Sequence, residues 1–240
     1  MNAKYLRQIA LPGWGLEGQK RISESRVLIA GMGGLGSSLA LMLAAAGTGT
    51  MVLMDGDFVE ESNLARQFLF TEKNLGENKA EAAARFLHDR HPDVDVISIP
   101  QFLSVASPGL PEDLSFVFDC TDQISARYEI DQLSRERGLP WIHASIHQMQ
   151  GQVAAFNLPL SNGARSASYS DFYPQSAQEI PIPDCSLAGV SPHFPAFLAS
   201  CMAGEFFKFQ TGMGPCLTNE LLLINGLTMY IQKIRLHGKS

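Results

Sequence analysis

Cysteine is scarce in this sequence of 240 residues, which contains only four and places no two of them as a C-x-x-C pair. Such pairs are the usual local signature of a structural zinc site or a dithiol redox centre, so the chain carries neither signature. The N-terminal residues also lack the apolar core and the small-residue cleavage site of a signal peptide. We therefore expect a protein of the reducing cytoplasm whose thiols are free.

Basic charge is also in short supply, since 18 lysines and arginines stand against 24 aspartates and glutamates, for a formal net charge of -6. Nucleic acids and anionic membrane surfaces attract proteins with an excess of positive charge. The composition therefore argues against both kinds of partner.

Charge is absent altogether between Val27 and Met54, a stretch long enough to span a bilayer. Spanning helices are usually apolar without interruption. This stretch is instead broken by glycines at positions 31, 33, 34, 36, 47 and 49, and its periodicity changes partway. A strand, a tight turn, a buried helix, a second turn and a second strand fit it better, so we expect no membrane-spanning segment.

Apolar strand-like segments alternate with helix-like segments along most of the chain. Strands are expected over residues 26–30, 50–54, 94–99, 114–118, 141–144 and 152–157. Helices are expected from the glycine turn to about residue 46 and over 79–91 and 125–138. This alternation predicts an α/β fold with a doubly wound, mainly parallel sheet.

The remaining segments complete one expected domain over residues 1–240. They are a helical arm over 1–25, the core over 26–157, a long loop over 158–184, and a C-terminal helix and hairpin over 185–240. A loop of that length is usually a functional lid or a disordered segment. The hairpin is expected to turn at Asn225-Gly226, the strongest short hairpin signal, and to give the sheet an antiparallel extension.

The glycine-rich motif Gly31-Met-Gly33-Gly34-Leu-Gly36 follows a strand and opens a helix. Glycines let the backbone approach a phosphate, and a helix N-terminus directs free N–H groups at negative charge. Asp55 ends the next strand, where a carboxylate can accept hydrogen bonds from ribose hydroxyls. The motif predicts a Rossmann-like nucleotide site, and up to this point NAD and ATP fit equally well.

Positive side chains downstream favour ATP. Asn63 and Arg66 lie just beyond the expected ribose position, and Lys79 opens the next helix, near the carboxyl ends of the strands. Two fixed cations beside a phosphate turn suit a triphosphate, whose charge grows at the leaving pyrophosphate, and a dehydrogenase has no need of them. The alternative is that both cations are solvated surface charges.

Asp122 is the candidate magnesium ligand. The segment Asp119-Cys-Thr-Asp122-Gln123 ends an apolar strand, where a loop can aim a carboxylate into the cleft. Mg²⁺ takes carboxylate oxygen together with phosphates and water. The alternative for Asp122 is a helix N-cap for the segment after Ser125. A structural role suits Asp119 better.

Taken in order, these residues resemble the ThiF/MoeB/HesA family, relatives of the ubiquitin-activating enzymes. The resemblance covers nearly the whole chain, and its Asn-x-x-Arg-Gln element is far more specific than the glycine turn. The matching segments are Tyr5-Leu-Arg7-Gln8, Gly31 to Gly36, Asp55, Ser62-Asn63-Leu-Ala-Arg66-Gln67, Gly76-Glu-Asn-Lys79, Asp119-Cys-Thr-Asp122 and Cys185-Ser-Leu-Ala-Gly189-Val190.

The resemblance implies an ATP-dependent adenylyltransferase. Its substrate would be the C-terminal glycine carboxylate of a small ubiquitin-like sulfur carrier protein ending in Gly-Gly, of the ThiS or MoaD kind, for thiamin or molybdopterin biosynthesis. It implies that the 158–184 loop is a crossover segment under which the tail of the carrier threads. It also implies that Arg7 reaches from one subunit into its partner's site, which makes the active unit a homodimer.

The resemblance further assigns roles within the nucleotide site. It gives ribose binding to Asp55, phosphate binding to Asn63, Arg66 and Lys79, and Mg²⁺ to Asp122. The neighbouring Asp57, Gln67 and Gln123 complete the expected cofactor-binding set, which also includes the glycines at positions 31, 33, 34 and 36.

The sequence departs from the family pattern at the zinc-binding positions and matches it at one cysteine. Family members commonly bind structural zinc with two C-x-x-C pairs, but Ser168 and Asp171 stand about where the first pair would be, and the second is missing. We therefore expect no zinc. Cys185 matches the family position that in some members bonds covalently to the carrier, and it is either such a nucleophile or a cysteine packed beside the loop.

Two other functions remain open at the level of sequence. One is an NAD-dependent oxidoreductase on the same fold. The other is a non-catalytic module that binds nucleotide or carrier without turnover. Motif matches are hypotheses, and both alternatives keep the glycine turn.

Overall fold

An eight-stranded sheet forms the centre of the computed structural model, which describes residues 3–174 and 189–236. The strand order is β3-β2-β1-β4-β5-β6-β7-β8. The strands are β1 (Arg26–Ala30), β2 (Thr50–Met54), β3 (Asp95–Ile99), β4 (Phe116–Asp119), β5 (Trp141–His147), β6 (Gln150–Phe156), β7 (Glu220–Asn225) and β8 (Tyr230–Arg235). Pairing is parallel from β3 to β5 and antiparallel from β5 to β8. This confirms the predicted mainly parallel sheet and its antiparallel C-terminal extension.

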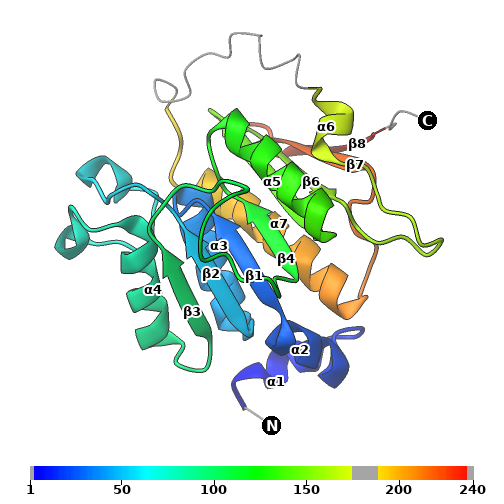
Figure 1. Cartoon of the computed structure of the whole chain (residues 1–240), viewed down its shortest axis with the longest axis horizontal. Coiled ribbons are helices and arrows are strands. Elements are labelled where there is room, and N and C mark those ends of the chain that lie inside the picture. Colours follow the sequence, from blue (N-terminus) through cyan, green and yellow to red (C-terminus); the bar gives the residue numbers. More distant parts are fainter. Residues whose placement is uncertain (1–2, 175–188, 237–240) are drawn as a thin grey trace.

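Helices cover both faces of this sheet (Figure 1). They are η1 (Ala3–Tyr5), α1 (Leu6–Ile9), α2 (Gly15–Glu24), α3 (Gly34–Ala46), η2 (Glu61–Asn63), η3 (Glu72–Asn74), α4 (Lys79–Arg90), α5 (Ile124–Arg137), α6 (Tyr169–Phe172) and α7 (His193–Thr211). One core packs α3, α4 and α7 against one face, and a second packs α5 and α6 against the other. Because β1 supplies side chains to both cores, its run of apolar residues is explained by burial on both sides.

The carboxyl ends of β1 and β4 mark the switch point of the sheet. From β1 the chain returns through α3 to β2 on one side, whereas β4 lies on the other side and leads through α5 to β5. Ala30 pairs with Asp119, so the residues that follow, Gly31 and Cys120, lie side by side. Ligands of open α/β sheets bind in the crevice that opens at such a point.

The N-terminal arm, expected to be helical over residues 1–25, divides into short helices. It forms η1, α1 and α2, with a break between the last two at Pro12 and Gly13. Proline has no N–H to donate, and Gly13 adopts φ 85°, which favours glycine. The arm packs beside the amino ends of the strands, since Gly49 donates to the Ile22 carbonyl and Thr50 to that of Ser25.

The C-terminal hairpin is confirmed, but its turn is longer than predicted. Asn225 pairs with Tyr230, which leaves residues 226–229 as a four-residue connection. The Asn225 side chain accepts hydrogen bonds from the backbone N–H groups of Leu227 and Thr228 at 3.0 and 3.1 Å. Asparagine therefore turns the chain through its side chain, rather than as the first residue of a two-residue turn.

The long segment after β6 is not without structure. It contains the bridge between Pro159 and Arg165 and the short helix α6, and the part beyond residue 174 lies outside the described residues. Within residues 3–174 and 189–236, no helix has both the length and the apolarity needed to cross a bilayer.

Candidate functional site

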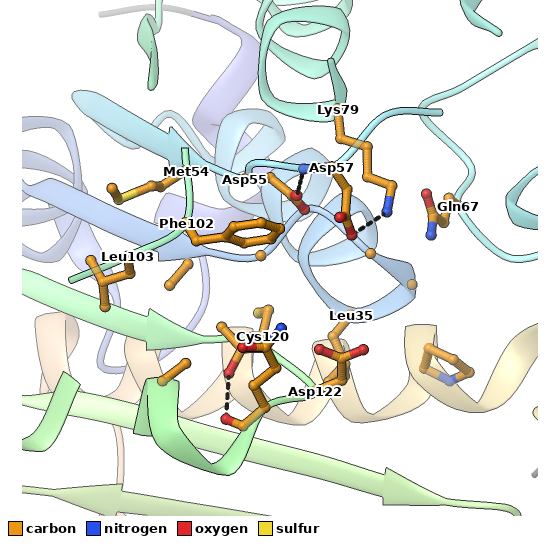
Figure 2. A pocket seen from close by; sticks show the side chains of 18 of the residues that line it. Leu35, Met54, Asp55, Asp57, Gln67, Lys79, Phe102, Leu103, Cys120 and Asp122 are labelled. Carbon is orange, nitrogen blue, oxygen red and sulfur yellow. Dashed lines mark hydrogen bonds and ion pairs between the residues drawn. The ribbon is translucent and has the colours of Figure 1, made fainter. Parts of the chain in front are cut away.

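A cleft of about 780 Å³ lies at the carboxyl edge of the sheet and gathers most of the predicted site residues (Figure 2). The predicted residues lining it are Gly31, Gly33, Gly34, Asp55, Asp57, Asn63, Arg66, Gln67, Lys79, Asp122 and Gln123. Its volume is that of a site for a nucleotide-sized ligand. Of the other predicted residues, Gly36 lies just behind the turn, Arg7 lies elsewhere, and Cys185 lies outside the described residues.

The glycine turn is built by close backbone packing. Gly31 has φ 91°, and a Cβ there would meet the Cys120 carbonyl oxygen at 2.6 Å. A Cβ on Gly36 would meet the Gly31 carbonyl oxygen at 1.9 Å. Any side chain at position 36 would therefore push the first turn of α3 away from the strand and spoil the anion-binding N-terminus.

We expect Gly36→Ala to abolish detectable ATP binding. The added methyl group cannot be accommodated against backbone, so the turn itself must move. Gly204→Ala on α7 is the matched control, because a Cβ at Gly204 meets nothing within 4 Å and alanine favours a helix by about 1 kcal/mol. Isothermal titration with ATP and thermal melting of both variants provide the check, and unchanged ATP affinity in Gly36→Ala would contradict this account of the turn.

Asp55 is buried at the end of β2 and joins the glycine turn to the loop that follows. Its carboxylate accepts hydrogen bonds from the backbone N–H groups of Met32 at 2.6 Å and Asp57 at 2.8 Å. Burial raises the pKa of Asp55 above its ordinary value, although these two hydrogen bonds and the charge of Lys79 act in the opposite direction. The carboxylate is thus held rigidly beside the turn, where ribose hydroxyls could donate to it.

Lys79 and Arg66 supply positive charge to the same cleft. Lys79 is only 8% exposed, and its ammonium group lies 3.0 Å from the Asp57 carboxylate. The dashed line between the two side chains in Figure 2 marks this ion pair. The Arg66 guanidinium donates to the Ser62 carbonyl oxygen at 2.7 Å. Lys79 is therefore not a solvated surface charge, and both cations line the cleft, Lys79 from the start of α4 and Arg66 from the loop after η2.

Two amide side chains, those of Asn63 and Gln67, also line the cleft. The Gln67 side-chain oxygen is buried without a hydrogen-bond partner among the described residues, and its side-chain nitrogen is 3.9 Å from where a Cβ on Gly33 would be. An unpaired buried acceptor is costly, so a donor group on a ligand or a water would be favoured there. Asn63 instead closes the η2 turn, since its side-chain oxygen accepts from the Glu60 N–H.

Asp122 lies exposed on the loop after β4 and faces the cleft (Figure 2). The N-cap position of α5 belongs to Gln123, so the alternative role of Asp122 as a helix cap is wrong. The described residues contain no group of three or more histidine, cysteine or acidic side chains placed to hold a metal. One carboxylate in a phosphate cleft does fit Mg²⁺, which keeps waters and takes its remaining ligands from phosphates.

Asp119 is fully buried behind this loop. It accepts hydrogen bonds from His143 Nδ1 at 2.6 Å and from Thr121 N and Oγ1 at 3.0 and 2.7 Å. Arg127, on α5, lines the cleft and places its Nε 3.7 Å from the same carboxylate. The sequence pattern did not predict a role for His143 or Arg127, because each contacts Asp119 only when β5 and α5 are packed beside β4.

The apolar wall of the cleft was also missed by sequence reasoning. It is formed by Met54 and by Phe102 and Leu103 from the loop after β3. Phe102 is 59% exposed, and its ring lies against Gly56, where an added Cβ would come within 2.8 Å of it. A flat apolar surface beside a ribose site suits an aromatic base. A lone aromatic residue in an irregular loop carries no periodic signal that would predict this position.

Arg7 lies far from the cleft of its own chain. It is exposed on α1, and the neighbouring Gln8 donates to the Ala46 carbonyl oxygen at the C-terminal end of α3. The cleft lies at the other end of that 13-residue helix. At about 1.5 Å per residue the separation is about 20 Å, which is too far for an arginine side chain to reach.

The structure describes one thiol at the cleft and the two positions, Ser168 and Asp171, where family members are expected to carry zinc-binding cysteines. Cys120 lies at the cleft, where burial raises the pKa of its thiol well above the ordinary value, so it is a poor nucleophile. Ser168 and Asp171 form a capping box at the start of α6, with the Ser168 hydroxyl donating to the Asp171 carboxylate at 2.8 Å. Hydrogen bonds thus hold the backbone at this position.

Comparison with known proteins adds an independent line of evidence. The chain matches the ThiF family over residues 5–240. It is 34% identical over 232 residues to the sulfur carrier protein adenylyltransferase of Thermus thermophilus, covering 96% of this chain and 86% of that protein. It is also 34% identical to the probable adenylyltransferase/sulfurtransferase MoeZ of Mycobacterium tuberculosis and to the adenylyltransferase and sulfurtransferase MOCS3 of Mus musculus. These two alignments include 97% and 98% of this chain. The chain nevertheless spans only 59% of the length of MoeZ and 50% of the length of MOCS3.

Solved structures share the fold. The crystal structure of E. coli MccB with ATP superposes with a TM-score of 0.81 at 21% identity, covering 100% of this chain and 72% of that one. The crystal structure of PaaA gives a TM-score of 0.79 at 24% identity and covers 99% and 73%. At this level of identity the likeness establishes the Rossmann-like architecture alone.

Proposed function

This chain belongs to the ThiF family, and from that premise we propose that it uses ATP to adenylate the C-terminal glycine carboxylate of a small ubiquitin-like sulfur carrier protein. One observation carries the proposal from the family to this chain. Lys79, Arg66 and Asp122 converge on the cleft that the glycine turn forms at the switch point of the sheet. The names of the relatives, which are adenylyltransferases, support the same activity.

The reaction needs positioning more than acid–base chemistry. The carboxylate oxygen attacks the α-phosphorus, the bond from that phosphorus to the bridging oxygen breaks, and pyrophosphate leaves with the electron pair. No proton must be moved, so holding the reactants in line and neutralising their charge provide most of the catalysis. The carrier carboxylate and the triphosphate of ATP are both negatively charged, and this repulsion explains why positive side chains are needed at the cleft.

Several of the lining residues have a role in this proposal. The α3 N-terminus and the glycines cradle phosphates, Asp55 accepts from the ribose, and the wall at Phe102 supports the adenine. Lys79 and Arg66 bind the phosphate oxygens, where Lys79 would exchange Asp57 for a more highly charged partner. Asp122 would hold Mg²⁺, which when bound supplies charge stabilisation to the phosphates.

The remaining parts of the proposal concern assembly and setting. We propose a single domain that works as a homodimer in the cytoplasm, in which Arg7 completes the partner's site. The carrier is of the ThiS or MoaD kind, and the product serves thiamin or molybdopterin biosynthesis. Zinc plays no part in this proposal, and the covalent role of Cys185 stays a prediction.

The test is ATP–pyrophosphate exchange in the presence of a purified carrier. We expect exchange that depends on the carrier and disappears when its terminal glycine is removed, since the reacting carboxylate is then displaced. Tight NAD binding without ATP binding would instead support the oxidoreductase. ATP binding with no pyrophosphate exchange or release would identify the non-catalytic module.

A further inference from the structure

Four side chains form a continuous chain of hydrogen bonds across the sheet, on the face covered by α5 and α6. Tyr173 Oη donates to Gln152 Oε1 at 3.4 Å, and Gln152 Nε2 lies 3.2 Å from His143 Nε2. His143 Nδ1 lies 2.6 Å from Asp119 Oδ2. We call these four residues, Tyr173, Gln152, His143 and Asp119, the polar chain.

The protonation states give the polar chain a single direction. Burial lowers the pKa of His143, so its ring is neutral near pH 7. Burial alone would raise the pKa of Asp119, but the hydrogen bond from His143, the positive charge of Arg127 and the hydrogen bond from Thr121 outweigh that effect and lower it, so Asp119 is ionised. The one proton of His143 then sits on Nδ1 and is donated to Asp119, which leaves Nε2 free to accept from Gln152. Every donor points from Tyr173 towards Asp119.

At its inner end the polar chain fixes the loop that bears Asp122. Asp119 Oδ1 accepts from both the backbone N–H and the hydroxyl of Thr121. Because Asp122 follows Thr121 directly, the orientation of that turn decides where its carboxylate enters the cleft. Neither His143 nor Gln152 lines the cleft itself, and their hydrogen-bonded connection to the loop of Asp122 runs through Asp119.

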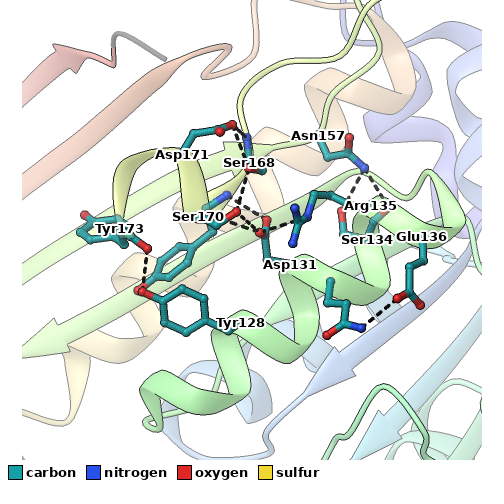
Figure 3. A network of polar contacts seen from close by, with 12 residues as sticks. Tyr128, Asp131, Ser134, Arg135, Glu136, Asn157, Ser168, Ser170, Asp171 and Tyr173 are labelled. Atoms are coloured by element: carbon teal, nitrogen blue, oxygen red, sulfur yellow. Dashed lines mark hydrogen bonds and ion pairs between the residues drawn. The ribbon is translucent and has the colours of Figure 1, made fainter. Parts of the chain in front are cut away.

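At its outer end the polar chain reaches α6. Tyr173 is the C-cap residue of that helix. The start of α6 is fixed separately, since the buried carboxylate of Asp131 on α5 accepts from the N–H groups of Tyr169 and Ser170 and from the Ser170 hydroxyl (Figure 3). A helix of one turn is thus held at both ends, and its far end is hydrogen-bonded through to the nucleotide loop.

We propose that His143 and Gln152 are positioning residues for adenylation, which hold Asp119 and the loop of Asp122 in a fixed relation to α6. The proposal rests on the function proposed above. Groups that orient the ligands of a site commonly change activity by about 10- to 100-fold when removed. A buried polar network that served only folding would change stability and leave the chemical step alone.

The first experiment compares His143→Leu with His143→Asn in carrier-dependent exchange. Leucine removes the donor to Asp119, and we expect kcat to fall by about 10- to 100-fold while the KM for the carrier stays within about threefold. The asparagine side chain can place its amide N–H near the Nδ1 position, so His143→Asn should recover most of the lost kcat. A wild-type kcat in His143→Leu, with only a lower melting temperature, would overturn the proposal.

The second experiment tests the outer end with a matched pair of hydroxyl deletions. Tyr173→Phe removes the first donor of the polar chain. Tyr128→Phe removes a hydroxyl from the same interface, which donates at 2.6 Å to the backbone carbonyl oxygen of Tyr173 rather than to a side chain of the polar chain (Figure 3). We expect only Tyr173→Phe to lower kcat, and its effect should vanish in the His143→Leu background, because residues of one network do not act additively. Equal effects of the two variants would show that the polar chain does not extend to α6.

A measurement that needs no catalysis can test the polar chain separately from the proposed adenylation activity. If wild-type protein shows no ATP–pyrophosphate exchange with any carrier, the proposed function fails. Hydrogen–deuterium exchange at the Thr121 amide still tests the polar chain in that case. Protection of that amide should fall in His143→Leu and stay unchanged in Tyr128→Phe. Unchanged protection in a folded His143→Leu protein would overturn the positioning role. If that variant does not fold, Tyr173→Phe carries the test, and wild-type kcat together with wild-type protection of the Thr121 amide in Tyr173→Phe would overturn the proposal.

Discussion

Asp122→Ala is expected to reduce carrier-dependent ATP–pyrophosphate exchange by about 10²- to 10³-fold, with little change in thermal stability. Asp122 is the acidic residue that the loop after β4 exposes to the cleft, beside the glycine turn. Removing it takes away the group proposed to hold Mg²⁺ against the phosphates. An exposed side chain that makes no helix cap should change the free energy of unfolding by no more than about 0.5 kcal/mol.

Asp113→Ala is the matched control for this variant. Asp113 is also an exposed aspartate, and it pairs with Arg26 at the amino end of β1, away from the cleft. We expect it to retain wild-type exchange. Steady-state exchange with saturating carrier and a thermal melt of each variant provide the comparison. Equal exchange rates for the two variants would remove Asp122 from the mechanism and take the main support from the proposed function.

The parts of the site that could be predicted from sequence are those fixed by local chain geometry. A buried strand followed by glycines and a helix is the local sequence of a phosphate-binding turn. The position of Gly31, Gly33 and Gly34 in the wall of the cleft could therefore be predicted from their order in the sequence. Asp55 and Lys79 were predictable for the same reason, since one ends a strand and the other opens a helix. The carboxyl ends of parallel strands meet at one edge, so such residues must converge.

The parts that could not be predicted depend on which elements pack together. Phe102 reaches the cleft only because an irregular loop folds back over Gly56. His143 looks in sequence like any polar residue in a strand, and its bond to Asp119 requires β4 and β5 to be neighbours in the observed register. The turn at Asn225 was misplaced because its side chain, rather than its backbone, bridges a longer connection.

The N-terminal arm shows the same limit at the level of assembly. From the sequence, Arg7 is an ordinary surface arginine, and only the family resemblance gives it a catalytic role. The fold restricts how Arg7 could act. The neighbouring Gln8 is hydrogen-bonded to the C-terminal end of α3, whereas the cleft lies at the N-terminal end of that helix. Within one chain Arg7 cannot serve the cleft, so any part it has in adenylation must be played in a second copy.

Mixing two inactive variants should therefore restore activity. Arg7→Ala protein should dimerise normally, as judged by sedimentation, yet lose at least about 10²-fold in exchange, the loss typical of removing one group that stabilises developing charge. When it is mixed with Asp122→Ala protein under conditions of subunit exchange, half of the dimers pair one variant with the other. In each mixed dimer one cleft has both Asp122 and the partner's Arg7, so about a quarter of wild-type activity should return.

The control for this complementation replaces the arm variant by a second cleft variant. Mixing Lys79→Met with Asp122→Ala should restore nothing, because both residues line the same cleft and every site in the mixed dimer lacks one of them. Recovery in that control would point to residual activity rather than shared sites. No recovery in the Arg7→Ala mixture, with subunit exchange demonstrated by a labelled chain, would mean that Arg7 does not act across the dimer, and the arm would then be a structural element at the amino edge of the sheet.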